Sequence, residues 1–254
     1  MTAPEAKLCL MTRTKSLTIA LAATVAAGVL TLATATASNA AALPPKPSDP
    51  GIPTSFDYRD CPQLPSGADP AAWRCEVMVA NIRLATGRIP AVDVPLTVTH
   101  SEGPLPDGTT GQVFGAMHAR SVAVPGIPGL RIQPEYAGHA DFIGNGTIRG
   151  SIDITLRLQY PGSRRTCAIG SDRAPLTINS TAYGPTQWVS QQPPIIKGEM
   201  YDSTFAVPGV NGCGPIVDRL LDRGFALPSP AGRNQFSLVG YYSFRTHADL
   251  TGQA

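Results

Sequence analysis

The sequence predicts an all-β protein, an antiparallel sandwich or half-open barrel with one short helix and two disulfides. Residues 146–160 alternate between apolar and polar side chains, which is the pattern of a half-buried strand. Shorter segments with the same alternation follow one another along the chain and are separated by Gly- and Pro-rich turns. One segment, 215–223, has convincing helical periodicity. Many short strands with a single helix are typical of sandwiches and barrels.

The longest predicted strand is 146–160, with the sequence GTIRGSIDITLRLQY. From residue 148 on, its even positions are apolar or Gly and its odd positions are polar, so one face of the strand is apolar. Asn145-Gly146, at its start, is typical of a hairpin turn. At about 3.3 Å per residue the strand approaches about 50 Å, and an apolar face of that length must be covered.

Two kinds of cover are consistent with this apolar face. A second sheet, as in a sandwich, is the usual solution. The alternative is a curved sheet that lines a hydrophobic groove for an apolar or lipid-like ligand. In that second case the ligand would contact these side chains of the strand: Ile148, Ile152, Ile154, Leu156, Leu158 and Tyr160.

The other predicted strands are less regular. In segment 73–85 the apolar residues change from odd to even positions near Ala80, which predicts a β-bulge. Segment 92–99 contains Pro95, which lacks an N–H for the ladder and therefore predicts an edge strand. Segment 182–197 has no period and predicts an irregular loop. Further strands are predicted at 112–124, 130–143, 166–169, 176–181, 199–207 and 235–247.

The predicted helix covers about residues 215–223. Pro215 suits the first helical position, where its missing N–H would be unpaired anyway. Gly224 is a natural residue to end the helix because it tolerates a left-handed conformation. The apolar stripe of this helix consists of Ile216, Val217, Leu220 and Leu221.

The N-terminal region predicts export. Basic residues precede an apolar, Ala- and Thr-rich segment at 17–32, and small residues follow it. This is the pattern of a signal peptide over residues 1–40, cleaved between Ala37 and Ala40, with Met11 as an alternative start. A membrane anchor is the other interpretation, but the many Ala and Thr residues make the segment a weak span. We therefore expect a secreted, extracellular protein with no stable membrane anchor after cleavage.

The mature chain divides into a linker and a β domain. Residues 41–55 are Pro-rich and aperiodic, so they predict an extended linker or a disordered arm. Residues 56–254 predict one β domain, and the Pro- and Gly-rich stretch 125–129 is where two halves would divide. Removing the three basic and one acidic residues of positions 1–40 from 20 and 18 leaves 17 of each. A net-neutral chain carries no electrostatic footprint for nucleic acid or an anionic membrane.

Four cysteines remain after position 40, and an exported chain predicts that they form two disulfides. Three pairings are open, and the shortest loops favour Cys61–Cys75 with Cys167–Cys213. A metal site is the alternative, but no Cys-x-x-Cys or paired His spacing supports it. No cofactor is predicted.

Several phrases in the C-terminal half carry a resemblance: QPEYAG at 133–138, TCAIGSDRAPLTINST at 166–181, FAVPGVNGCGP at 205–215 and LPSPAGRN at 227–234. Together, over roughly 133–247, they resemble a group of exported actinobacterial proteins with no assigned function. The phrases consist mostly of turn residues and two cysteines. The resemblance implies secretion and a Cys167–Cys213 disulfide, and it implies no activity.

Catalytic motifs are not evident. There is no Gly-x-Ser-x-Gly, and the four mature cysteines are accounted for by disulfides. His100 with Glu102, and His139 with Asp141, are two residues apart and would share a strand face, but two ligands do not make a metal site. An exposed His beside a carboxylate near a strand end is the simpler interpretation. No catalytic, cofactor-binding or metal-ligating residue is therefore predicted.

The leading hypothesis from the sequence is a secreted, non-enzymatic β protein with a structural or binding role at the cell surface or in the medium. It would act as a cell-envelope component or as a binder. The alternative is a carrier that binds an apolar, lipid-like ligand against the strand 146–160. A third hypothesis is an exported hydrolase whose site has no recognisable motif.

Overall fold

The computed structural model describes residues 42–144, 148–164 and 166–251. The predicted signal peptide at 1–40 and the predicted Asn145-Gly146 turn therefore lie outside the described residues. From Ala42 onward the chain forms one compact unit. The stretch 125–129 is a turn that leads from a short strand into the strand paired with it.

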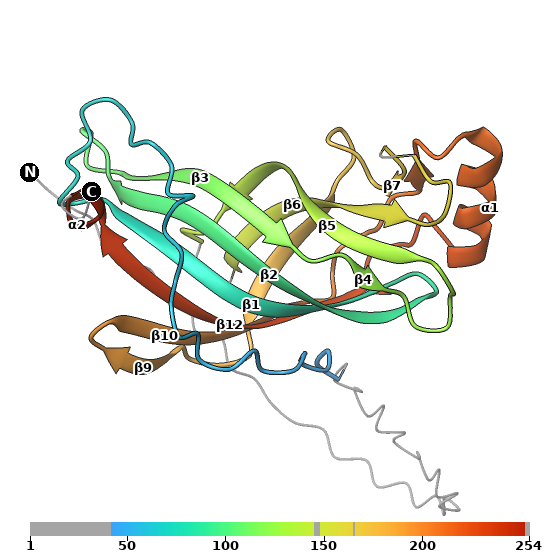
Figure 1. Ribbon diagram of the computed structural model, residues 1–254, viewed down its shortest axis with the longest axis horizontal. Coiled ribbons are helices and arrows are strands. Elements are labelled where there is room, and N and C mark those ends of the chain that lie inside the picture. The colour runs from blue at the N-terminus through green and yellow to red at the C-terminus, as the bar shows by residue number, and fades with distance from the viewer. Residues whose placement is uncertain (1–41, 145–147, 165, 252–254) are drawn as a thin grey trace, which may run out of the picture. The chain divides into compact units, whose positions relative to one another are not determined.

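The described residues form one curled, antiparallel sheet of twelve strands (Figure 1). This confirms the predicted fold class and selects the half-open barrel over the sandwich. The main path of the sheet runs β11-β7-β6-β8-β10-β12-β1-β2-β3. Its long strands are β1 (Arg74–Thr86), β2 (Ile89–Pro104), β3 (Thr110–Ala119), β5 (Arg131–Asp141), β6 (Ile148–Gln159), β8 (Leu176–Ala182), β10 (Pro194–Asp202) and β12 (Gln235–Thr246). The shorter strands are β4 (Val122–Ala123), β7 (Ala168–Ile169), β9 (Gln187–Gln191) and β11 (Val210–Asn211).

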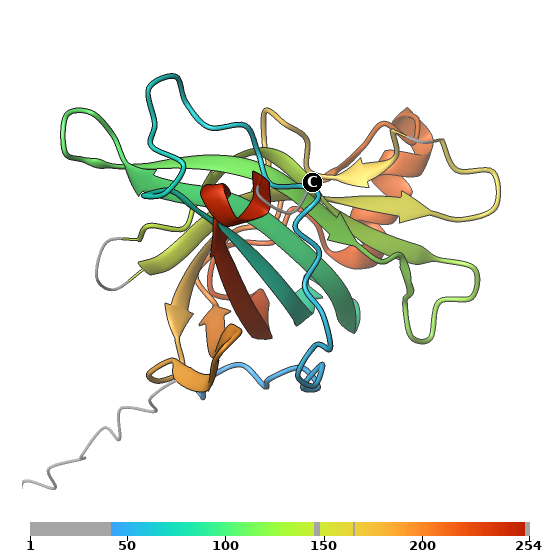
Figure 2. The same cartoon turned by 60° about the vertical axis from the view of Figure 1, so that its left-hand side comes forward.

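The sheet curls until β3 approaches β5, as the turned view shows (Figure 2). The two strands are not hydrogen-bonded neighbours in the described part of the chain. Side chains bridge them instead: Gln112 Nε2 donates to the Ala140 carbonyl at 3.1 Å, and Gln133 Nε2 donates to the Ala119 carbonyl at 2.9 Å. The half-barrel is thus held together along this seam by amide side chains and by the stacked rings of Phe114 and Tyr136, whose centroids lie 3.9 Å apart, and not by a backbone ladder.

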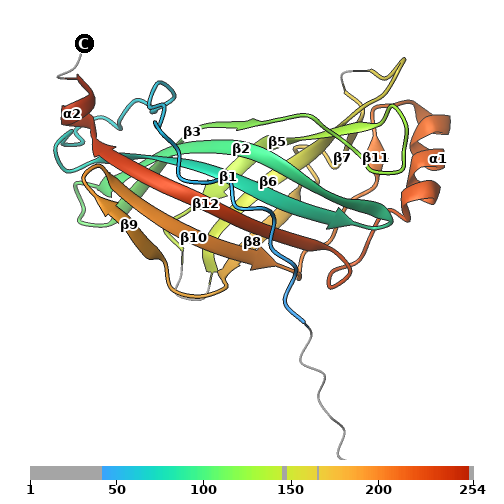
Figure 3. The ribbon, with the colours of Figure 1, turned by 60° about the horizontal axis from the view of Figure 1, so that its bottom comes forward.

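The two ends of the half-barrel differ in packing. Helix α1 (Pro215–Phe225) lies at one end and helix α2 (His247–Thr251) at the other (Figure 3). Near α1 the interior is filled by large, fully buried side chains, so this end is closed. They include Ile82, Leu84, Ile132, Leu156, Leu158, Ile169, Leu176 and Val207.

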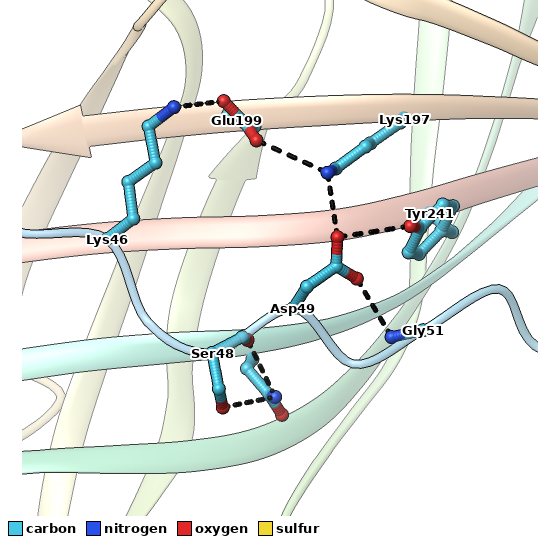
Figure 4. Close-up of polar contacts among 8 residues, drawn as sticks. Lys46, Ser48, Asp49, Gly51, Lys197, Glu199 and Tyr241 are labelled. Carbon is cyan, nitrogen blue, oxygen red and sulfur yellow. Dashed lines mark hydrogen bonds and ion pairs between the residues drawn. The ribbon is translucent and has the colours of Figure 1, made fainter.

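The predicted linker 41–55 is docked on the sheet over its described residues. It is extended and has no regular secondary structure. Asn81 Nδ2 donates to the Ser48 carbonyl at 2.9 Å, and Lys197 Nζ donates to Asp49 at 2.7 Å (Figure 4). Tyr241 donates to the same carboxylate at 3.2 Å. The outward, odd positions of β1, β10 and β12 carry these polar groups, which is why a Pro-rich arm finds partners there.

The predicted β-bulge near Ala80 is wrong. Strand β1 keeps a continuous register with β12, and its register with β2 shifts only between Leu84 and Thr86. The apolar residues of β1 change from odd to even positions for another reason: a different face of the strand is covered in its first and second halves. At its start the outward face is covered by segment 56–61, which the Cys61–Cys75 disulfide ties to the strand. From Ala80 on, the inward face is the one that packs in the core.

The prediction that the strand containing Pro95 lies at a sheet edge is correct for the part of β2 before Leu96 and wrong for the part after it. The ladder with β3 begins at Leu96, opposite Ala119, so residues 96–104 lie inside the sheet. Residues before Leu96 pair only with β1 among the described strands, and there a missing N–H costs no ladder bond. The prediction that 182–197 is an irregular loop is wrong, because β9 and the start of β10 pair as a hairpin within it.

Helix α1 extends further than predicted. Gly224 lies inside it, and Ala226 adopts the left-handed conformation at its end, with φ of 55°. Of the predicted stripe, Ile216 and Leu220 are 75% and 64% exposed, while the other two residues pack against the core. Neither helix among the described residues is long and apolar enough to cross a membrane.

Both predicted disulfides are formed. Cys61 pairs with Cys75, and Cys167 pairs with Cys213. The first ties the N-terminal loop to β1, and the second ties the segment before β7 to the one before α1. Two disulfides indicate an oxidising, extracellular setting.

Candidate functional site

A cavity of about 530 Å³ lies inside the half-barrel. Most of its lining residues hold even positions of β1, β2, β6, β8, β10 and β12, the positions that face the interior. Ile143, which is 45% exposed, and the exposed Arg149 are also among them, so the cavity reaches the surface. Its volume falls in the range of about 300–1,000 Å³ that is usual for small-molecule sites.

The walls of the cavity are mainly apolar. Three methionines take part, and their flexible thioether side chains adapt readily to different ligand shapes. The apolar wall is formed by Met78, Ile82, Leu96, Val98, Met117, Ile152, Ile154, Ile196, Met200, Phe236 and Leu238. Such a surface offers a ligand burial of its hydrocarbon part with few directional constraints.

The predicted apolar face of strand 146–160 divides between this cavity and the core. Ile152 and Ile154 line the cavity. Leu156 and Leu158 are fully buried in the core at the closed end, and Tyr160 packs against that core. The side chain of Ile148 lies outside the described residues. The even face is therefore continuous in sequence, but among its described positions those at 150, 152 and 154 line the cavity and the later ones do not.

The polar end of the cavity centres on Glu76 and His100. They are direct cross-strand partners on β1 and β2 and both line the cavity. Directly opposed residues on one face have Cβ atoms about 4.5–5.5 Å apart. Neither side chain forms a hydrogen bond with any described residue, although His100 is only 6% exposed. The Glu76 carboxylate lies 4.0 Å from the Arg74 guanidinium.

An ion pair lies one step further along the same face. Arg74 Nε donates to Glu102 Oε1 at 2.9 Å, and the guanidinium lies 5.1 Å from the centre of the Phe244 ring. The Arg74 side chain is 47% exposed, and that of Glu102 is 16% exposed. The charge of Arg74 is thus already matched by a carboxylate within the cavity wall.

Burial shifts the pKa values of both central groups. Desolvation raises the pKa of Glu76 to about 7, and the Glu102 charge adds to this effect while Arg74 opposes it. Desolvation also lowers the pKa of His100 to about 4, against a smaller opposing effect of Glu102. Near neutral pH the polar end therefore contains a neutral imidazole and a carboxyl group that is about half protonated.

Tyr242 supplies a third polar group from β12. Its ring lies against Gly198 of β10, where an added Cβ would come within 2.8 Å of Tyr242 Cε2. Glycine at 198 thus leaves room for the ring on the inner face. Burial, and next the nearby Glu76, raise the pKa of the Tyr242 hydroxyl, which has no hydrogen-bond partner among the described residues.

The sequence patterns missed this constellation. His100 and Glu102 are assigned there to an exposed strand end, but both face the interior. The available signal was the even positions of β1, where Arg74 and Glu76 precede apolar residues on one face. Charged residues at the start of an otherwise apolar strand face are consistent with a water-filled cavity and equally with an exposed strand end. The periodicity of the sequence does not distinguish these two environments.

Among the described residues, the other histidines do not form a second site. Ser101 Oγ lies 2.8 Å from His247 Nε2, but Ser101 is fully buried and does not line the cavity. His139 is exposed at the β5 irregularity. Within residues 42–144, 148–164 and 166–251, no three His, Cys, Asp or Glu side chains are arranged to hold a metal ion.

Comparison of the chain with protein-family models, curated proteins and solved structures finds no match. The resemblance to exported actinobacterial proteins therefore stays a prediction. The cavity and the groups that line it are the features of this protein that point to a function.

Proposed function

We propose that this protein is a secreted, non-enzymatic carrier that binds a small apolar molecule inside the half-barrel. The observation that carries the proposal is the cavity of about 530 Å³ with its largely apolar wall. A sheet built only for a structural role would pack this face, as the α1 end of the same sheet is packed. Of the two roles expected for a secreted β protein, structural or binding, the cavity supports the binding role.

Hydrocarbon burial supplies enough free energy for such a role. Each methylene moved from water to an apolar wall contributes about 0.8 kcal/mol, so ten contribute about 8 kcal/mol before the cost of ordering the ligand. The disulfides suit a protein that holds its cavity open outside the cell. The proposal includes export of the protein, with cleavage of the signal peptide between Ala37 and Ala40. The mature protein would then act at the cell surface or in the medium, without a nucleic-acid partner.

The first experiment asks whether the cavity is occupied and can be filled. Organic extraction of the purified mature protein, followed by mass spectrometry, identifies any apolar ligand retained from the host. Titration of the delipidated protein with the neutral fluorescent probe N-phenylnaphthylamine measures binding directly. Saturable binding at a single site supports the proposal. A protein that yields no extracted ligand and binds no apolar probe contradicts it.

A matched pair of variants locates the binding. Ile152→Trp places a large ring in the cavity, while Leu220→Trp places the same ring on the exposed face of α1. We expect the first to weaken probe binding by at least about tenfold, which corresponds to about 1.4 kcal/mol, and the second to leave it unchanged. Circular dichroism and thermal unfolding check that both variants are folded. Equal binding by the two would place the probe elsewhere.

A second candidate is an enzyme that transfers protons in the same cavity. It is favoured by the direct pairing of Glu76 with His100, because perturbed titratable groups in a cleft are typical of active sites. The two candidates differ in the fate of the ligand. A carrier returns the bound molecule unchanged after prolonged incubation, whereas an enzyme releases an isomer or another product that mass spectrometry and chromatography detect.

A further inference from the structure

Three polar side chains that line the cavity form no hydrogen bond with a described residue: Glu76, which has only the Arg74 guanidinium 4.0 Å away, His100 and Tyr242. Buried polar groups in native structures are almost always hydrogen-bonded, to protein, to water or to a ligand. His100 shows the problem most clearly, because it is 6% exposed and lines the cavity without a hydrogen bond. A ligand that displaces water from these three groups must replace the hydrogen bonds that water makes with them, because an unpaired buried polar group is costly.

The three groups converge on one region. Glu76 lies directly opposite His100 on β2. On the other side of β1, Glu76 lies opposite Phe244 and Met78 lies opposite Tyr242, so Tyr242 is a diagonal neighbour of Glu76 on the same face. Diagonal neighbours lie within reach of long and aromatic side chains. A single polar group of a ligand placed above Glu76 is therefore adjacent to all three side chains.

The charges around this region do not favour an anion. Arg74 is the cation closest to Glu76, and it is paired with Glu102. With Glu76 included, this part of the wall has one basic and two acidic groups. Arg149 also lines the cavity, but it is exposed, and exposed ion pairs contribute little. A ligand carboxylate at the polar end would lose its hydration without gaining a buried, unpaired cation.

We propose that the cavity selects an uncharged amphiphile whose polar end is a hydroxyl or carbonyl group, bound by Glu76, His100 and Tyr242. This rests on the proposed binding function and names its ligand class. The Tyr242 hydroxyl and a protonated Glu76 donate hydrogen bonds, and a neutral imidazole both donates and accepts. An alcohol, which accepts and donates at one oxygen, matches this set, while the hydrocarbon part of the ligand occupies the Met- and Ile-lined wall.

The test compares three ligands with the same hydrocarbon chain: decanol, decanoate and decylamine. Each is used at pH 7 to displace N-phenylnaphthylamine from the delipidated protein. We expect decanol to bind at least about tenfold more tightly than decanoate and decylamine, because the charged head groups must be desolvated. Tighter binding of decanoate or of decylamine would overturn the proposal, since it would show that the polar end receives an anion or a cation.

Two tyrosine variants separate hydrogen bonding from packing. Tyr242→Phe removes only the hydroxyl in the cavity, and we expect it to weaken decanol binding by about fivefold to tenfold, with the probe affinity of each variant measured separately. Tyr241→Phe is the control, because its hydroxyl bonds Asp49 on the opposite face of the same strand. Unchanged decanol binding in Tyr242→Phe would refute the ligand class while leaving a carrier. Absence of all probe binding in the wild type would instead refute the proposed function.

Discussion

Replacing Glu76 by Gln removes an ionisable group from the cavity and preserves its size and shape. In the folded protein, burial raises the pKa of Glu76 from 4.5 to about 7. The unfolded chain therefore releases this proton at a lower pH than the folded protein does. Between these pH values the folded state binds more protons, so the free energy of unfolding decreases as pH rises.

The expected size of this effect follows from the shift. A change from 4.5 to about 7 at about 1.36 kcal/mol per pKa unit gives about 3 kcal/mol. At pH 8 this shift lowers the free energy of unfolding of the wild-type protein, because Glu76 is ionised inside the cavity. Near pH 4.5 Glu76 is protonated in the folded protein, and this destabilisation is absent. Glu76→Gln has no such penalty at either pH. We therefore expect the stability of the variant relative to wild type to rise by about 3 kcal/mol from pH 4.5 to pH 8.

Urea unfolding of both proteins at pH 4.5 and pH 8, followed by circular dichroism, measures this difference. His100 has the opposite sign: its lowered pKa makes folding less favourable as pH falls from 6.5 toward 4. His100 is present in both proteins, so its contribution largely cancels in the comparison. The groups facing Glu76 are Arg74, His100, Glu102 and Tyr242, and all four are retained in the variant.

Glu135→Gln is the control, because Glu135 lies on β5 with its side chain 40% exposed and paired with Arg157. We expect its stability relative to wild type to change by less than about 0.5 kcal/mol between the two pH values. If Glu76→Gln behaves like this control, the carboxyl group is hydrated and the description of a desolvated polar end is wrong. A relative destabilisation of Glu76→Gln at pH 8 would contradict the sign of the shift.

Three further predictions concern the framework of the site. Gly198→Val should displace the Tyr242 ring, destabilise the protein by about 1–3 kcal/mol and weaken probe binding; Gly224→Val in α1, where an added Cβ meets no atom within 4 Å and which does not line the cavity, is the control, and equal effects would contradict this explanation. Asp49→Asn should lower global stability by less than about 1 kcal/mol but speed proteolysis within residues 42–55, as mass spectrometry of the fragments would show. Replacing Cys167 and Cys213 by Ser opens a link across 46 residues and should cost about 4 kcal/mol in urea unfolding; a loss below about 1 kcal/mol would contradict the chain-entropy account.

The local elements could be predicted because each depends on a short-range pattern. Strand β6 follows from alternation, and α1 from Pro215 with an apolar stripe. Both disulfides follow from the four cysteines and the preference for short loops. The errors arise where partners are remote. Segment 182–197 shows no period, yet pairing with β12 stabilises β10 within it.

The cavity shows that the alternation of apolar and polar residues does not predict the environment of a single side chain. Ile154 and Leu156 hold equivalent positions in the alternation of β6, and both are almost fully buried. Both pack in the core, but only Ile154 also lines the cavity. On β1, Arg74 and Glu76 at the start of a strand suggest solvent, but the curl of the sheet places both on the wall of the cavity. No property of these residues alone distinguishes the two environments.

Local patterns are enough to establish that this chain forms strands with one apolar face, one short helix and two disulfides, because backbone geometry imposes a period of two on any half-buried strand. What the apolar face contacts depends on how the strands are arranged in space. The curvature of the sheet sets the distance between β6 and the strands opposite, and that distance leaves a packed core beside Leu156 and open space beside Ile152. The same curvature brings Glu76, His100 and Tyr242 from three strands to the polar end of that space, where the ligand is expected to bind.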